Sequence, residues 1–175
     1  MCLCPGCFCP PAAKRLRHNT RPWTDPLLLT NLVYVAAAVV SYAVGQYTCG
    51  LLQLGSSIAS TMFHRSRETK YLPLDAIISG TLGIIAAYVV LDAIENELHH
   101  VLGLKLLHGA GCAFTWIYCG MPGGARYETW HKRWHYVSGY TTLSCSLLMS
   151  VYHPDFDAIV LKWLFPNGAP LNLGM

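Results

Sequence analysis

The chain has 175 residues and a formal net charge of +3, with 53% hydrophobic and only 12% charged residues. Soluble domains carry roughly 25% charged residues, so this composition excludes an ordinary soluble domain. A small net charge in so apolar a chain also speaks against a nucleic-acid-binding protein. We therefore expect an integral membrane protein whose partners are membrane lipids, with no nucleic acid among them.

Residues 1–25 form a cysteine-rich and basic N-terminal segment, which begins MCLCPGCFCPP and continues through KRLR. Three interpretations stay open: S-acylation beside a basic patch as a membrane anchor, a thiolate metal site, and a targeting or disordered leader. We favour the anchor, because thiols on an inner membrane face stay reduced and the spacing differs from that of zinc fingers. The cysteines concerned are Cys2, Cys4, Cys7 and Cys9.

Five apolar stretches follow within residues 26–153, and each approaches the roughly 20 residues that a helix needs to cross a bilayer. The second stretch is rich in glycine and serine, which lets helices approach closely and favours a place inside the bundle. Helices satisfy their own backbone groups in lipid, so the sequence predicts an all-α transmembrane bundle of about five spans. The expected spans are 26–45, 47–64, 71–94, 101–119 and 127–152.

The connections between these stretches are short and no internal repeat stands out, which favours a single helical domain over residues 26–153. Residues 154–175 are then a C-terminal arm outside the bundle. The arm ends in the turn-rich sequence FPNGAPLNLGM.

Charge predicts the orientation of this bundle. With five spans, ten of the twelve Lys and Arg residues fall on the face that holds the N-terminus. The positive-inside rule makes that face the cytoplasmic one, or its equivalent in an organelle. The residues counted are Lys14, Arg15, Arg17, Arg21, Arg65, Arg67, Lys70, Arg126, Lys132 and Arg133.

Five polar residues lie near span ends on this same inner face. His131 and His135 are four residues apart in HKRWH, so their rings project from one side of a helix. Ser60 and His64 end the second span with the same spacing. Asp75 lies one turn into the third span, where an ionised carboxylate is costly unless it has a partner.

Three convergent histidines are a typical zinc ligand set with an open fourth position, where a bound water becomes acidic enough to supply hydroxide near neutral pH. We expect His64, His131 and His135 to hold zinc. Asp75 could take a proton from that water or orient it, and Ser60 could steady the water or a developing oxyanion. A single histidine near a membrane interface is more often an amphipathic residue among the lipid headgroups than a metal ligand. The joint arrangement of the three histidines favours the metal site.

The remaining polar groups favour structural roles. We expect His108 to bond a neighbouring helix and Lys105 to reach water along its stem. Glu128, three residues before His131, is either a partner that orients a metal ligand or a plain interfacial charge. Four cysteines read as small core residues: Cys49, Cys112, Cys119 and Cys145.

The motif formed by Ser60-xxx-His64, Asp75 eleven residues later and His131-xxx-His135 resembles that of the CREST superfamily. This superfamily includes the alkaline ceramidases and the adiponectin and progestin receptor-like proteins. The resemblance implies a helical membrane hydrolase in which the histidines bind zinc, the aspartate engages the zinc water and the serine assists at the reacting carbonyl. It further implies that the substrate is a ceramide-like lipid amide.

Two functions from different classes remain as expectations. The first is a zinc-dependent membrane hydrolase of lipid amides that enter from the bilayer. The second is a catalytically inactive structural or accessory subunit of a larger membrane complex, derived from that family and shortened, because about five spans are fewer than is usual in the family. Turnover of a lipid amide by the wild-type protein discriminates between them.

Overall fold

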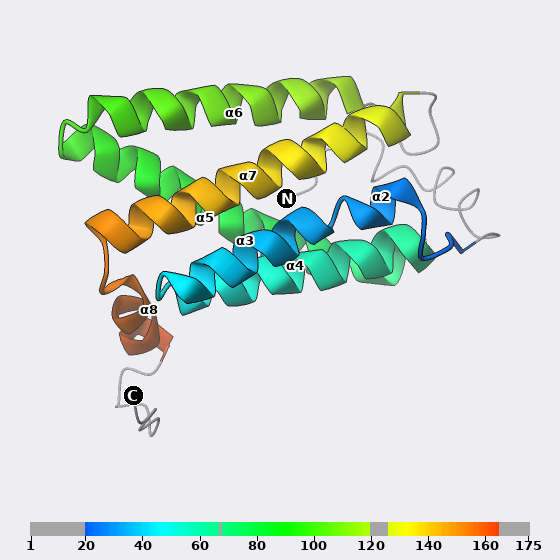
Figure 1. Cartoon of the computed structure of the whole chain (residues 1–175), viewed down its shortest axis with the longest axis horizontal. Coiled ribbons are helices and arrows are strands. Elements are labelled where there is room, and N and C mark those ends of the chain that lie inside the picture. The colour runs from blue at the N-terminus through cyan, green and yellow to red at the C-terminus, as the bar shows by residue number, and fades with distance from the viewer. Residues whose placement is uncertain (1–19, 67, 120–125, 165–175) are drawn as a thin grey trace.

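The structure is a computed structural model that describes residues 20–66, 68–119 and 126–164. Every regular element within these ranges is a helix, which confirms the predicted all-α class. The long helices lie along one another in an elongated bundle (Figure 1). Several predictions fall outside the described residues: those for Cys2, Cys4, Cys7, Cys9, Lys14, Arg15, Arg17, Arg67 and the last eleven residues of the C-terminal arm, 165–175.

The first predicted span, residues 26–45, is interrupted. It consists of a short helix α2 (Pro26–Leu29) and a longer helix α3 (Leu32–Ala43). The interruption falls at Thr30 and Asn31, whose side chains are almost completely buried. Both side chains bond to other helices, so the break directs polar groups into the bundle.

A tight turn reverses the chain between α3 and α4 (Tyr47–Ser66). Gly45 has a φ of 79°, a conformation that glycine adopts without steric cost. The Gln46 amide donates to the Ser41 carbonyl at 2.8 Å, and the Gly45 amide donates to the Tyr42 carbonyl at 3.1 Å. This pair of bonds is a Schellman motif, which satisfies carbonyls at the end of α3.

The remaining predicted spans also form helices, with ends close to those expected. A 3₁₀ turn, η1 (Thr69–Tyr71), leads into α5 (Leu72–Glu95), which is followed by α6 (His99–Cys119) and α7 (Tyr127–Tyr152). A further helix, α8 (Phe156–Leu164), opens the segment that was expected to be an arm.

Within the described ranges, three segments are long and apolar enough to cross a membrane: Pro26–Ala43, Leu72–Glu95 and His99–Cys119. These segments support a membrane protein, but they are fewer than the five spans that the sequence predicts. Helices α4 and α7 have 20 and 26 residues and are long enough, so their polarity sets them apart.

A buried polar network accounts for the polarity of α4 and α7. Gln53 of α4 receives a hydrogen bond from Ser41 of α3 at 2.7 Å and donates to Ser146 of α7 at 2.9 Å. All three side chains are buried. Helices α4 and α7 therefore direct polar groups at one another and at α3, an arrangement that stabilises contacts between helices inside a membrane bundle.

The end of the bundle at the α5–α6 turn is closed by apolar packing. Val89, Val101 and Met149 are buried there, and Phe156 of α8 packs against them. The Asp157 carboxylate of α8 also accepts hydrogen bonds from the first two amides of α4. The predicted site residues lie toward the opposite end, where α4 finishes and α7 begins (Figure 1).

Candidate metal centre and adjoining cavity

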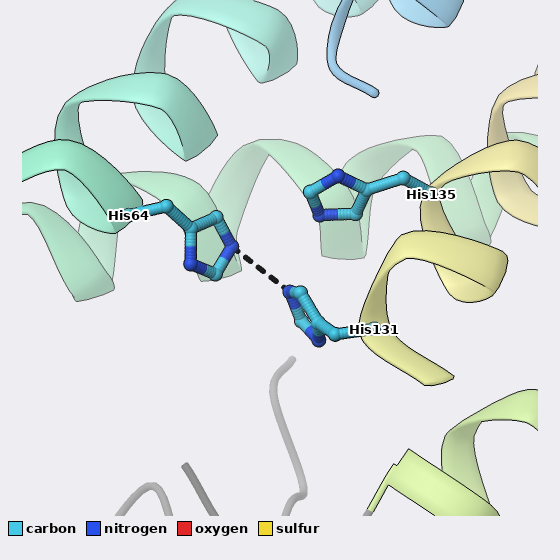
Figure 2. A group of neighbouring side chains, drawn as sticks. All are labelled: His64, His131 and His135. Carbon is cyan, nitrogen blue, oxygen red and sulfur yellow. Dashed lines mark hydrogen bonds between the residues drawn. The ribbon is translucent and has the colours of Figure 1, made fainter. Parts of the chain in front are cut away.

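The three predicted metal ligands meet at this opposite end of the bundle (Figure 2). His64 lies in the last turns of α4, and His131 and His135 lie one turn apart near the start of α7. One ring nitrogen from each lies within 4.8 Å of those from the other two. We call these residues the histidine cluster; within the described residues, they form the group that could hold a metal ion.

The environment of the histidine cluster fits a bound metal. All three side chains are buried, with exposures of 6%, 5% and 2% in chain order. Aromatic rings hold two of them: Tyr127 stacks on His131 with centroids 4.6 Å apart, and Tyr34 packs edge-on against His135. Imidazole nitrogens that converge in a buried space are a donor set suited to zinc and to several other transition metals.

The second nitrogens of two predicted ligand rings contact residues for which the sequence predicted no such role. The Nδ1 atom of His135 lies 2.7 Å from the Thr30 hydroxyl, and Nδ1 of His131 lies 3.3 Å from the Cys119 sulfur. The expectation that Cys119 is only a small core residue is therefore incomplete, because this buried thiol contacts a predicted metal ligand.

A cavity of about 510 Å³ adjoins the histidine cluster. His131 and His135 line it together with Ser60 and Asp75, so the fold brings the predicted catalytic residues beside the predicted ligands. Ser60 and Asp75 are themselves buried, with exposures of 4% and 8%. Asp75 lies on the wall of this cavity and outside the histidine cluster.

Much of the wall of this cavity is apolar. Residues of α5 and α6 supply the apolar part, including Gly80, Gly83, Ile84, Ala87, Ala113 and Trp116. Both helices are among the segments apolar enough to cross a membrane. The cavity therefore pairs a group of polar side chains with a hydrocarbon-like wall.

Ser56 and Tyr34 also line the cavity and were not predicted. The sequence could have indicated Ser56, because residues 56, 60 and 64 are spaced four apart and therefore share one face of α4. Tyr34 gave no such signal, since its approach to the cavity depends on how α3 packs against α7. Its hydroxyl bonds to Ser138 of α7.

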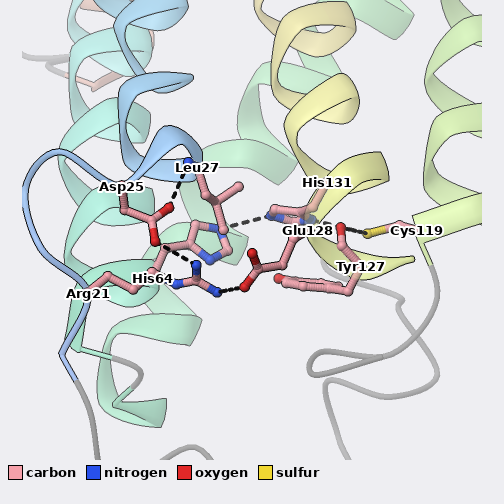
Figure 3. Close-up of polar contacts among 8 residues, drawn as sticks. All are labelled: Arg21, Asp25, Leu27, His64, Cys119, Tyr127, Glu128 and His131. Atoms are coloured by element: carbon pink, nitrogen blue, oxygen red, sulfur yellow. Dashed lines mark hydrogen bonds and ion pairs between the residues drawn. The ribbon is translucent and has the colours of Figure 1, made fainter. Parts of the chain in front are cut away.

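An ion-pair cluster lies beside the histidine cluster (Figure 3). Arg21 bonds through its guanidinium to Asp25 at 2.9 Å and to Glu128 at 2.5 Å, and its amide donates to the Arg65 carbonyl. The Glu128 carboxylate therefore pairs with a guanidinium. This agrees with the expectation that Glu128 is an interfacial charge, and not with the alternative that it orients His131.

The same contacts shift two pKa values. Burial alone raises the pKa of Asp25, but hydrogen bonds from Arg21 and from the Leu27 amide outweigh burial and lower it below its usual 3.8. Burial likewise lowers the pKa of Arg21, while its bonds to Glu128 and Asp25 outweigh burial and raise it. The cluster therefore ties the segment before α2 to the first turn of α7 through charged hydrogen bonds.

The prediction for Lys105 is wrong. Its side chain is 3% exposed and does not reach water; its ammonium donates to the Ser144 hydroxyl at 2.6 Å and to the Cys145 sulfur at 3.1 Å. Polar groups of α7 provide acceptors inside the bundle, which the sequence of α6 alone does not reveal. His108 bonds Ser144 across the same pair of helices at 3.2 Å, as predicted.

Comparisons of the chain with protein-family models, with curated proteins and with solved structures find no significant match. The site combines a histidine cluster that could hold a metal ion, an adjoining cavity, and a carboxyl and a hydroxyl group that line the cavity.

Proposed function

We propose that the protein is a zinc-dependent membrane hydrolase of lipid amides, similar to the ceramidases of the CREST superfamily. The observation that carries the proposal is the position of three buried imidazoles beside a cavity that Asp75 and Ser60 also line. Four of the five residues of the resemblance line this cavity, and the fifth, His64, contacts His131 beside it.

The proposed chemistry divides among these residues. The histidine cluster would hold zinc, which when bound lowers the pKa of a water in its open position to about 7. The Asp75 carboxylate accepts a proton from the attacking water and returns it to the leaving amine. The Ser60 hydroxyl donates a hydrogen bond to the amide carbonyl oxygen, on which negative charge develops.

The cavity favours an amphipathic substrate. Its volume lies within the roughly 300–1,000 Å³ typical of ligand sites. The amide of a ceramide-like lipid would lie at the histidine cluster, and a hydrocarbon chain would lie along the wall formed by α5 and α6. Because these helices are apolar enough to face lipid, substrate could enter sideways from the bilayer.

The site is proposed to face the cytoplasm or the equivalent inner compartment. Basic residues gather at the chain segments around the histidine cluster, as the positive-inside rule requires of an inner face: Arg21, Arg65, Lys70, Arg126, Lys132 and Arg133. Tryptophans, which concentrate at membrane interfaces, occur in the same segments: Trp23, Trp116, Trp130 and Trp134.

A turnover assay tests the proposal. Purified protein loaded with zinc should release fatty acid from at least one member of a panel of lipid amides. Removal of the metal with a chelator should abolish this activity, and zinc should restore it. Zinc-loaded, folded protein that leaves every lipid amide in the panel intact would contradict the hydrolase proposal.

A catalytically inactive accessory subunit is the second candidate. It is favoured by the apolar outer surface of α6, where Leu106, Leu107 and Ile117 are 58%, 69% and 75% exposed. Helices of a larger membrane complex could cover this surface as well as lipid does. This candidate predicts no turnover by the wild-type protein and co-purification with partner subunits from native membranes.

A further inference from the structure

The contact between Thr30 and His135 fixes where protons lie. The Thr30 oxygen is 2.6 Å from the Leu27 carbonyl oxygen and 2.7 Å from Nδ1 of His135. A carbonyl oxygen only accepts, so the hydroxyl hydrogen must point at Leu27. The Thr30 oxygen is then left to accept a hydrogen bond, and Nδ1 of His135 must be the donor.

This assignment determines which nitrogen of His135 can bind a metal. A neutral imidazole carries one proton, so a proton on Nδ1 leaves the lone pair on Nε2. A metal binds through a lone pair. Thr30 therefore holds His135 in the one neutral tautomer that offers Nε2 as a ligand.

Cys119 makes a related contact with His131. Its sulfur lies 3.3 Å from Nδ1 of His131 and 3.9 Å from the Tyr127 carbonyl oxygen, so the shorter contact is with the ring. Nε2 of His131 faces His64 at 2.9 Å. A metal bound at that Nε2 would leave the ring proton on Nδ1, where the sulfur can accept it.

We infer that Thr30 and Cys119 are positioning residues for two metal ligands, His135 and His131: each contacts the second ring nitrogen of its ligand, and Thr30 also sets the tautomer of His135. The inference rests on the metal-binding part of the proposed function and does not depend on the substrate. It also gives the interruption between α2 and α3 a role. Thr30 lies in that break, where its hydroxyl bonds back to Leu27 and across to α7.

Zinc affinity measured by competition with a chelator tests this inference. Thr30→Val keeps the size of the side chain but removes the hydroxyl, and we expect it to weaken zinc binding about 10- to 100-fold, the usual cost of losing such a partner. Thr30→Ser restores the hydroxyl and should restore the affinity. Thr142→Val is the matched control, because Thr142 is also buried but bonds within its own helix.

Nitrogen-15 NMR of histidine-labelled, metal-free protein provides a readout that does not depend on zinc. In the wild type, we expect His135 to carry its proton on Nδ1. In Thr30→Val, the proton should move to Nε2 or distribute between the two nitrogens. A His135 ring protonated at Nε2 in the wild type would overturn the inference.

The second ligand gives an independent test that does not require the Thr30 variants to fold. Cys119→Ala should weaken zinc binding, and Cys119→Ser should retain more of it because the hydroxyl still accepts a hydrogen bond. Cys49→Ala is the control, since Cys49 is a buried thiol outside the histidine cluster.

The outcomes separate this inference from the proposed function. Wild-type protein that binds zinc, together with Thr30→Val and Cys119→Ala variants that bind it equally well, would overturn the positioning role alone. Wild-type protein that binds no zinc would overturn the positioning role and the metal-dependent function together. Zinc binding with the expected variant effects, but with no lipid hydrolysis, would contradict only the hydrolase proposal.

Discussion

The Nε2 atoms of His64 and His131 lie 2.9 Å apart, although 67 positions separate the two residues in the chain. One atom comes from the end of α4 and the other from the start of α7. Two buried imidazoles that meet through their nitrogens could form part of a metal site, because a cation can replace the proton between them. His135, one helical turn from His131, completes the set.

This relationship predicts the metal content of the purified protein. Wild type should contain about one zinc per chain, and the double substitution His131→Ala with His135→Ala should remove it, because a single imidazole cannot complete a three-nitrogen site. Elemental analysis measures the content. His108→Ala is the control, since His108 bonds Ser144 away from the histidine cluster, and stoichiometric zinc in the double variant would refute the assignment.

The proposed role of Ser60 predicts that its substitution lowers the rate of hydrolysis without removing the metal. Ser60→Ala should retain zinc, while kcat for a lipid amide should fall by about 100- to 1,000-fold, the usual cost of losing a donor to a developing oxyanion. Ser57→Ala is a matched control, because Ser57 is buried on the same helix but donates to the Asn31 carbonyl. Equal rates for Ser60→Ala and wild type would remove Ser60 from the mechanism.

Membrane orientation can be tested with single cysteines in a background lacking reactive thiols. A membrane-impermeant reagent applied from outside should label Glu97→Cys, in the α5–α6 connection, and should not label Lys70→Cys, near the start of α5. Both positions are exposed, so access to the reagent depends on the side of the membrane. The reverse labelling pattern would place the histidine cluster at the outer face.

The ion-pair cluster predicts how stability depends on pH. The pKa of Asp25 is lowered below 3.8, so its stabilising contribution is complete above about pH 3.8 and is lost as the pH falls through the folded-state pKa. Thermal unfolding of wild type and Asp25→Asn in detergent measures the difference. The gap between their melting temperatures should be widest near neutral pH and should close in acid. A gap that widens in acid would contradict a stabilising role for the ionised Asp25.

The sequence predicts the helices and the proximity of the three histidines because both follow from regular spacing. Four-residue spacing placed His131 with His135 and Ser60 with His64, and helix lengths brought these pairs to one end of the bundle. The number of spans was harder to predict. Helices α4 and α7 are less apolar than the segments that could cross a membrane, because they carry polar side chains that bond to one another inside the bundle.

The residues that the sequence missed depend on contacts between helices. Thr30 contacts His135 because a break in the first helix turns its hydroxyl toward α7. No local sequence pattern predicted that break. Cys119 looked like a small core residue because its partner lies on the next helix. Lys105 looked exposed for the same reason: its acceptors belong to α7.

The catalytic claim depends most on Asp75. Substitution Asp75→Asn leaves the histidine cluster intact and should preserve both the fold and the zinc content. It removes the group proposed to accept and return a proton, so turnover of a ceramide-type substrate should fall by about 100-fold or more. Asp92→Asn is the matched control: Asp92 lies on the same helix at its other end, 3.0 Å from His153 and away from the cavity, so this variant should keep wild-type activity.

The most direct test is therefore to measure zinc content and ceramide hydrolysis side by side in wild type, Asp75→Asn and Asp92→Asn. The hydrolase account predicts one zinc per chain in all three, with turnover lost only in Asp75→Asn. Zinc-loaded wild type that hydrolyses no lipid amide, or an Asp75→Asn variant as active as wild type, would contradict it.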